Sequence, residues 1–352
     1  MKKKYYELYK QIKSEIISGE YKAGDKLPSK RVMADKYGYS IITVENAYGM
    51  LSEEGYIATK ERSGYFVEKL DVLARDGMVS EYRSPRLLDE KVCAVTPDFE
   101  SSVWVKTVRK VISERGNELF VKAPTKGCAV LRNAIAKYLL RYRGMQADAE
   151  RIVIGSGAEQ LYETIVKILG RDKTFGIEDP CYEKISQVYL SEGVKLEKLK
   201  MGDSGILSSE LTSKKFDVLH VTPFNSFPSG ITATAKKRYE YLTLAKKKGC
   251  YVVEDDFASE FFQPGNPIES LYSLDTERKV IYINTFSKSL SASMRMGYML
   301  LPEELLNKYD EVLGNFSCSV PVLEQYVLAE FINSGNFERH LNMVRRKLAK
   351  NK

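Results

Sequence analysis

The strongest chemical signal in the sequence is a lysine set between hydroxyl side chains. In Thr285-Phe286-Ser287-Lys288-Ser289 the lysine follows an apolar run, and Arg295 comes seven residues after it. Partial desolvation and a neighbouring positive charge would lower the pKa of Lys288 and leave a nucleophilic amine, as in lysines that form Schiff bases. Arg295 would offer a fixed cation to a phosphate group. The alternative is an ordinary solvated lysine.

Three further polar clusters also follow apolar runs. In Gly155-Ser156-Gly157-Ala158, small residues open a helical pattern, so backbone N–H groups there could approach a phosphate, although alone this is a weak signal. In Glu254-Asp255-Asp256, a carboxylate could coordinate a metal or hold a cationic ring nitrogen; the alternative is a solvated strand end with helix-capping acids. Segment 222–230, which contains Asn225, has two prolines and a glycine and indicates a rigid turn.

The elements that would position these clusters alternate between short apolar runs and amphipathic stretches. This alternation predicts an α/β fold with a mostly parallel sheet covered by helices. Open sheets of this class bind ligands beyond the carboxyl ends of their strands, which is where all four clusters lie. The predicted strands are 151–154, 174–178, 218–221, 251–254, 280–284 and 297–301, and the helical stretches include 128–143, 158–169 and 235–248.

The first seventy residues follow a different pattern. Apolar residues at helical spacing predict a helix over 5–17, Ser29 and Ser40 are good N-caps for two more short helices, and 56–67 reads as a strand, a basic turn and a strand. This order describes a winged helix-turn-helix, whose second helix of the pair enters the DNA major groove. The alternative is a winged helix that contacts protein. We predict domains at 1–70 and 93–352, joined by a linker at 71–92.

Composition narrows the class of protein. The 352 residues are 43% hydrophobic and 29% charged, which is ordinary for a soluble globular chain. No apolar run approaches the ~18 residues of a membrane helix, and no signal-peptide core follows the start, so we expect a cytoplasmic protein. Five cysteines without Cys-x-x-Cys spacing and two histidines argue against a disulfide framework and against a metal site.

Charge is concentrated at the two ends of the chain. Residues 1–70 hold 13 Lys and Arg against 10 Asp and Glu, and residues 341–352 hold five basic residues and no acid. With a net charge of +7, the middle of the chain is therefore near neutral. A basic N-terminal module indicates a nucleic-acid partner, and the alternative is a solvated lysine-rich face.

The N-terminal pattern resembles the GntR family of bacterial transcription regulators. The resemblance is carried by Leu27-Pro28-Ser29-x-Arg31, by Ser40-x-x-Thr43-Val44 followed by Ala47-Tyr48 and Glu54-Gly55-Tyr56, and by Ser63-Gly64-Tyr65-Phe66-Val67. The family usually has arginine where this chain has Ile41, which leaves open a contact with a thymine methyl or weaker DNA binding. The resemblance implies that Ser29, Arg31, Ser40, Thr43 and Gly64 meet operator DNA.

The order and spacing of the later clusters resemble fold type I of the pyridoxal-phosphate (PLP) enzymes, the aminotransferase class. Joined to a GntR-type winged helix, this domain resembles the MocR subfamily of regulators, over about residues 5 to 346. The resemblance implies PLP held as an internal aldimine on Lys288, with Asp255 paired to its pyridine nitrogen. It also implies a phosphate held by the backbone at Gly157 and Ala158 and by Thr285, Ser287 and Arg295, and an aromatic, Tyr182, beside the ring; core packing is the alternative for Tyr182.

Three departures from the family pattern argue against efficient turnover. Phe257 replaces a tyrosine whose hydroxyl would meet the cofactor's phenolic oxygen. Phe227 stands where aminotransferases have asparagine before the Pro228 turn, and Asn225 could compensate. The resemblance implies a small C-terminal domain that carries the arginine for the substrate carboxylate, and we expect this domain to be missing here; Lys184 is a weak candidate for a replacement.

We therefore expect a PLP-dependent, DNA-binding transcription regulator that acts as a homodimer. Its aminotransferase-like domain would sense a small amine, an amino acid or PLP itself, and its macromolecular partner would be double-stranded operator DNA, with no membrane and no metal. Two alternatives stay open. One is an active aminotransferase with a DNA-binding appendage, and the other is a DNA-binding regulator that has lost its cofactor.

Overall fold

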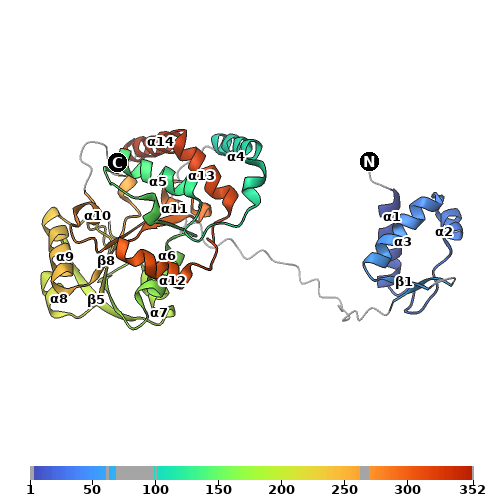
Figure 1. Ribbon diagram of the computed structural model, residues 1–352, viewed down its shortest axis with the longest axis horizontal. Coiled ribbons are helices and arrows are strands. Elements are labelled where there is room, and N and C mark those ends of the chain that lie inside the picture. Colours follow the sequence, from blue (N-terminus) through green and yellow to red (C-terminus); the bar gives the residue numbers. More distant parts are fainter. Residues whose placement is uncertain (1–3, 61–62, 69–98, 100, 262–268, 351–352) are drawn as a thin grey trace. The chain divides into compact units, whose positions relative to one another are not determined.

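The computed structural model of the chain describes residues 4–60, 63–68, 99, 101–261 and 269–350. The chain forms two compact units, Met1–Leu88 and Asp89–Lys352 (Figure 1). The predicted linker at 71–92 lies outside the described residues, so the domain boundaries stay a prediction. No helix among the described residues is both long and apolar enough to span a bilayer.

The smaller unit, blue in Figure 1, consists of three helices followed by a β-hairpin. Its helices are α1 (Lys4–Ile17), α2 (Lys30–Tyr37) and α3 (Ile41–Glu53), and its antiparallel strands are β1 (Ile57–Lys60) and β2 (Gly64–Val67). The apolar faces of all three helices enclose one core. Ser29 and Ser40 cap α2 and α3, as predicted, because each hydroxyl accepts a backbone N–H from the first turn. This is the predicted winged helix-turn-helix.

The larger unit is built on an eight-stranded sheet with the order β3-β10-β9-β8-β7-β4-β5-β6. Strands β5, β4, β7, β8 and β9 run parallel, whereas β10 is antiparallel to both β9 and β3, and β6 is antiparallel to β5. All six predicted strands are present, so the mostly parallel sheet is confirmed. They are β3 (Ile152–Gly155), β4 (Thr174–Asp179), β7 (Val218–Val221), β8 (Tyr251–Asp255), β9 (Val280–Thr285) and β10 (Gly297–Leu300).

The sequence pattern did not reveal β5 (Lys195–Gly202) or β6 (Gly205–Ile206). Strand β5 contains three lysines and a glutamate among its eight residues, and Leu199 is the only fully buried residue of the strand. A strand near the edge of a sheet needs few apolar residues, because one of its flanks and much of its surface stay in water.

Helices cover both faces of this sheet because side chains alternate along each strand. In β9, Tyr282 packs into an apolar cluster with α5, α13 and α14, whereas Ile281 and Ile283 pack on the other face with α6, α7 and α12 (Figure 1). The helices of this unit are α4 (Ser101–Arg115), α5 (Ala129–Arg143), α6 (Ala158–Leu169), α7 (Glu183–Ser191), α8 (Ser208–Ser213), α9 (Ala235–Lys248), α10 (Leu271–Leu274), α11 (Phe286–Ser289), α12 (Leu306–Leu313), α13 (Val322–Asn333) and α14 (Asn336–Lys350).

The strand register brings the predicted clusters to one edge of the sheet. Asp255 at the end of β8 is paired with Ile283 in the neighbouring strand β9, which ends at Thr285. Gly297 of β10 is paired with Thr285 on one side and with Gly155 on the other. The ends of β8, β9 and β3 therefore lie along the same carboxyl edge.

Candidate cofactor site and nucleic-acid interface

Lys288 lies in α11, a single helical turn that begins directly after β9. Its Nζ lies 4.6 Å from the ring centre of Phe257 and 5.8 Å from that of Phe261. Although much of the side chain is exposed, desolvation of the amine lowers the pKa of Lys288, in the predicted direction. The neighbouring charge differs from the prediction: it is the carboxylate of Glu260, which acts to raise this pKa.

Asp255 is buried at the end of β8, with 3% of its surface exposed. Its Oδ2 accepts a hydrogen bond from the hydroxyl of Tyr162, and Nε2 of His220 lies 3.8 Å from the same oxygen. His220 is held in turn through its Nδ1, which lies 2.7 Å from the hydroxyl of Tyr189. The other oxygen, Oδ1, is buried and has no hydrogen-bond partner among the described residues. A buried carboxylate with one open oxygen fits a protonated ring nitrogen, because such a donor would supply the missing partner.

The glycine-rich turn at the start of α6 lies against Arg295. Gly157 has a φ of 95°, a backbone conformation that favours glycine, and a Cβ at this position would lie 3.3 Å from Nη2 of Arg295. Nη2 of Arg295 also pairs with Glu159 at 2.9 Å, and Lys184 pairs with the other oxygen of Glu159 at 2.8 Å. A helix N-terminus with cations beside it can hold a phosphate.

Two hydroxyl residues from the predicted phosphate set lie on the neighbouring strand end and turn. Thr285 is buried at the start of α11, and its Cγ2 lies 3.0 Å from where Gly297 would carry a Cβ. Ser287, one residue before Lys288, is half-buried. In the strand register, Gly297 of β10 lies between Thr285 and Gly155, and Ala158 is the first residue of α6.

The predicted aromatic residues meet at the neighbouring strand ends. Tyr182 precedes α7, and its ring lies 6.0 Å from that of Phe227 in an edge-on arrangement. Tyr182 is 41% exposed, which argues against the core-packing alternative. Asn225 is exposed in the 222–230 turn, and in the described part of the chain no hydrogen bond joins its side chain to Asp255 or Lys288.

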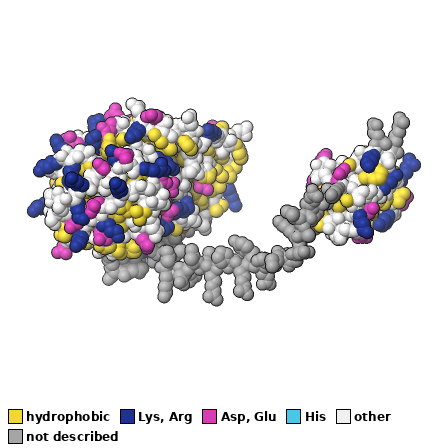
Figure 2. Space-filling model, turned by 90° about the horizontal axis from the view of Figure 1, so that it is seen from below, with side chains coloured by type: hydrophobic (Ala, Val, Ile, Leu, Met, Phe, Trp, Pro, Cys, Tyr) yellow, Lys and Arg dark blue, Asp and Glu magenta, His cyan; other side chains and the backbone are white. Residues whose placement is uncertain are grey.

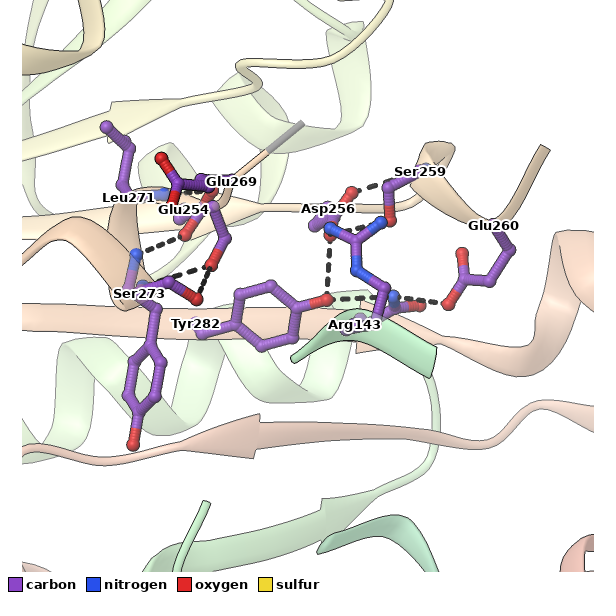
Figure 3. Close-up of polar contacts among 12 residues, drawn as sticks. Arg143, Glu254, Asp256, Ser259, Glu260, Glu269, Leu271, Ser273 and Tyr282 are labelled. Atoms are coloured by element: carbon purple, nitrogen blue, oxygen red, sulfur yellow. Dashed lines mark hydrogen bonds and ion pairs between the residues drawn. The ribbon is translucent and has the colours of Figure 1, made fainter. Parts of the chain in front are cut away.

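The three consecutive acids of β8 and its end have three different environments. Glu254 accepts backbone N–H groups of Leu271 and Tyr272, each at 2.8 Å, so the helix-capping alternative describes Glu254 (Figure 3). Burial raises the pKa of Glu254 to about 8. Asp256 is fully buried and ion-paired with Arg143 at 3.0 Å. Asp255 alone keeps an open oxygen.

The ion pair of Asp256 belongs to a larger polar network that the sequence did not reveal. The hydroxyl of Tyr282 donates to Asp256 at 2.7 Å, and Nδ2 of Asn284 lies 3.1 Å from that hydroxyl and 2.7 Å from Glu260 (Figure 3). Burial raises the pKa of Glu260 to about 7. Its member Glu260 is the acid whose charge acts on the pKa of Lys288.

Two residues beside Asp255 were also missed, Tyr162, which donates a hydrogen bond to it, and His220, whose Nε2 lies 3.8 Å from it. His220 is the only polar residue in the four-residue strand β7, and this interruption of an apolar strand was the available signal. Tyr162 lies four residues after Ala158, one turn into α6, so it shares a helix face with the glycine turn. Neither residue belongs to a contiguous motif.

In the smaller unit, the predicted DNA-contacting residues lie at the starts of two helices and in the β1–β2 hairpin, which is the wing of the winged helix. Oγ of Ser40 accepts the backbone N–H of Thr43 at 3.2 Å and lies 2.8 Å from the Thr43 hydroxyl. Arg31 is exposed in the first turn of α2. Gly64 opens β2 with a φ of 111°, and a Cβ there would lie 3.2 Å from Cε of Lys26.

Known families match both units. The profile of the bacterial regulatory proteins of the gntR family matches residues 4–67, and that of aminotransferase class I and II matches residues 91–352. The chain is 32% identical over 351 residues to the uncharacterized HTH-type transcriptional regulator YdeL of Bacillus subtilis, covering 97% of this chain and 76% of the relative. It is 28% identical to the probable rhizopine catabolism regulatory protein MocR of Rhizobium meliloti, covering 97% and 74%.

A solved structure is similar to the larger unit. It is the Pyrococcus horikoshii kynurenine aminotransferase in complex with PMP, which matches with a TM-score of 0.64 and 26% identity, over 70% of this chain. This chain spans 64% of the length of that aminotransferase, less than two thirds. The gntR match, the aminotransferase match and the relatives, which match over 97% of this chain, agree. The chain belongs to the MocR-type subfamily of GntR regulators, in which a winged helix is joined to an aminotransferase class I and II domain.

Proposed function

We propose that this protein is a transcription regulator whose aminotransferase-like unit holds PLP through Lys288. The single observation that supports this best is the buried Oδ1 of Asp255, which has no hydrogen-bond partner among the residues that the structure describes and lies at the sheet edge that also presents Lys288. A buried acceptor without a partner is costly unless a ligand supplies the donor. A pyridinium nitrogen is such a donor.

The described residues fit the other parts of this cofactor. Arg295 and the Gly157 turn would bind its phosphate, with Thr285 and Ser287 as further donors, and Tyr182 would lie beside its ring. The amine of Lys288, whose pKa desolvation lowers, would bond to the aldehyde carbon with loss of water. When bound, PLP supplies an electron sink for amines attached to it.

The signal would be an amine, an amino acid or PLP itself. Such a ligand shifts the protein between arrangements only to the extent that it binds one arrangement more tightly. In a cytoplasmic homodimer, the change would alter how paired winged helices meet two operator half-sites. The relatives named as transcriptional regulators support this use of the aminotransferase-like unit.

The experiment is to add PLP to the purified protein, record the visible spectrum, reduce with borohydride and map the labelled peptide. We expect one label, on Lys288, that is absent in Lys288→Ala. Lys184→Ala is the matched control, because Lys184 also lies at the predicted phosphate end and is bound to Glu159. A label that survives in Lys288→Ala, or no visible band at all, would contradict the proposed cofactor site.

The second candidate is an aminotransferase that turns over. It is favoured by the amine of Lys288 and the carboxylate of Asp255, which are the groups that such chemistry needs. Incubation of the PLP-loaded protein with amino donors and keto acids distinguishes the two functions. If the protein is a regulator, binding of the amino donor changes the visible spectrum of the PLP-loaded protein, but no new keto acid is released.

A further inference from the structure

In the smaller unit, the solvent-exposed face of α3 carries apolar side chains and one side-chain amide in its first two turns. Val44, Ala47, Tyr48 and Leu51 are buried in the core of this unit, so the opposite face of α3 lies in solvent. That face presents Ile42, which is 70% exposed, and Asn46, one turn further along. Ile41 beside it is 47% exposed. Two adjacent isoleucines in water at the start of a recognition helix have no packing role that explains both.

Cations lie around α3 but not on it. The helix contains no Lys or Arg, and its Glu45 is held in an ion pair by Lys30 of α2. Lys26, Arg31 and Lys60 belong to the segment before α2, to α2 itself and to the wing. Figure 2 shows hydrophobic and basic side chains next to one another on the displayed face of this unit. Contacts with phosphates therefore fall to the elements that flank α3, which leaves its first two turns for base edges.

The side chains on this face select among base pairs by their chemistry. Recognition of guanine through O6 and N7 uses Arg or Lys, and α3 has neither. An apolar side chain packs on the C5-methyl of thymine, and an asparagine amide bonds N6 and N7 of adenine. Side chains at i and i+4 of a helix are neighbours, so Ile42 and Asn46 can read adjacent positions along the groove.

We propose that α3 reads A·T base pairs in the major groove, with Ile42 packed on a thymine methyl, Ile41 beside it, and the Asn46 amide bonded to adenine. This inference rests on the proposed DNA-binding function and identifies the bases that it recognises. Specificity comes from methyl and amide contacts, and the flanking cations supply affinity without sequence preference.

The test begins by selecting duplexes from a random library with the full chain. We expect each enriched half-site to contain A·T pairs, and we then replace individual thymines by uracil, which removes the methyl and keeps base pairing. Loss of one buried methyl contact weakens binding about fourfold. Replacing the contacted adenine by 7-deazaadenine removes N7 and is expected to weaken binding about tenfold.

Variants assign each effect to a side chain. Ile42→Ala is expected to weaken binding to the thymine duplex by the same factor as the loss of the methyl, and to leave binding to the uracil duplex unchanged. Asn46→Ala is expected to weaken binding to the adenine duplex by the same factor as the loss of N7, and to leave binding to the 7-deazaadenine duplex unchanged. Ile17→Ala is the matched control, because Ile17 is a similarly exposed isoleucine, at 54%, in α1 of the same unit. Ile42 and Asn46 are exposed, so their substitution is not expected to disturb the core. The base substitutions use the unchanged protein, so the test does not depend on how the variants fold.

Two failures are distinguishable. If no sequence is enriched, the proposed DNA-binding function itself is overturned, together with this inference. If half-sites are enriched but lack A·T pairs, or bind equally with uracil in place of thymine, only the assignment to Ile42 and Asn46 is overturned.

Discussion

Asp255 and Asp256, adjacent acids at the carboxyl edge of the sheet, are both buried but differ in how their oxygens are hydrogen-bonded. Asp256 is satisfied within the protein, by Arg143, Tyr282 and Ser259. Asp255 is held by Tyr162 on one oxygen and keeps the other open. We propose that the difference separates an acid that stabilises the fold, Asp256, from one that is available to a ligand, Asp255, although both are buried and are neighbours in sequence.

The largest expected effect is the loss of unfolding free energy on substitution of Asp256, the acid whose hydrogen bonds are satisfied within the protein. In Asp256→Asn, Arg143 would remain a buried charge without its partner, and breaking such a pair costs about 3–5 kcal/mol of unfolding free energy. Urea unfolding of the full chain measures it. The matched control is Glu303→Gln, whose partner Arg278 is 69% exposed, where an exposed pair contributes less than about 1 kcal/mol. A loss at Asp256 no larger than at Glu303 would contradict the structural role.

Substitution of Asp255, the acid with the open oxygen, is expected to have the opposite result, with little loss of stability and a large loss of PLP affinity. Asp255→Asn can still accept the hydrogen bond from Tyr162, so the unfolding free energy should change by only about 1 kcal/mol. It loses the charge that would pair with a protonated ring nitrogen, and the dissociation constant for PLP should rise about 10- to 100-fold. Titration of the visible band measures the constant. If Asp255→Asn loses stability as Asp256→Asn does and binds PLP normally, the comparison between the two acids is wrong.

The remaining acid of the row, Glu254, is expected to change only how the unfolding free energy depends on pH. Burial raises the pKa of Glu254 to about 8, so the folded protein holds this proton where the unfolded chain has lost it. The stability that this group contributes is present at acid pH and is lost as the pH rises from about 5 to 8. Urea midpoints over this range should therefore fall less steeply in Glu254→Gln than in the unchanged protein.

Glu304 provides the control for that measurement. Hydrogen bonds from Lys279 and Tyr251 lower its pKa, so its contribution changes only at more acid pH. Glu304→Gln should shift the midpoints equally from pH 5 to 8. Parallel curves for Glu254→Gln and the unchanged protein would show that Glu254 is not the titrating group.

The parts of the candidate site that are contiguous in the chain could be located from local signals, and their roles stay predictions. Asp255 is the last residue of β8, and the Gly157 turn and Lys288 come shortly after the ends of β3 and β9, so the rule that parallel strands end at one edge predicts that they converge. The winged helix was predicted for the same reason, since its caps at Ser29 and Ser40 are local signals.

What could not be predicted depends on which elements are neighbours in space. His220 meets Asp255 because β7 lies beside β8, and Arg143 meets Asp256 from the end of a helix more than a hundred residues earlier in the chain. The charge beside Lys288 was predicted to be positive, but the fold places the carboxylate of Glu260 there. No spacing in the sequence determines the strand order that produces these contacts.

Helix α6 connects the two ends of the site. It begins at the turn that packs on Arg295, and five residues after Gly157 it carries Tyr162, which bonds Asp255. A helix rises about 1.5 Å per residue, so these two anchor points are about 7.5 Å apart along its axis. One rigid helix therefore joins the glycine turn to the residue that orients Asp255, so a displacement of α6 would move both ends of the proposed site together.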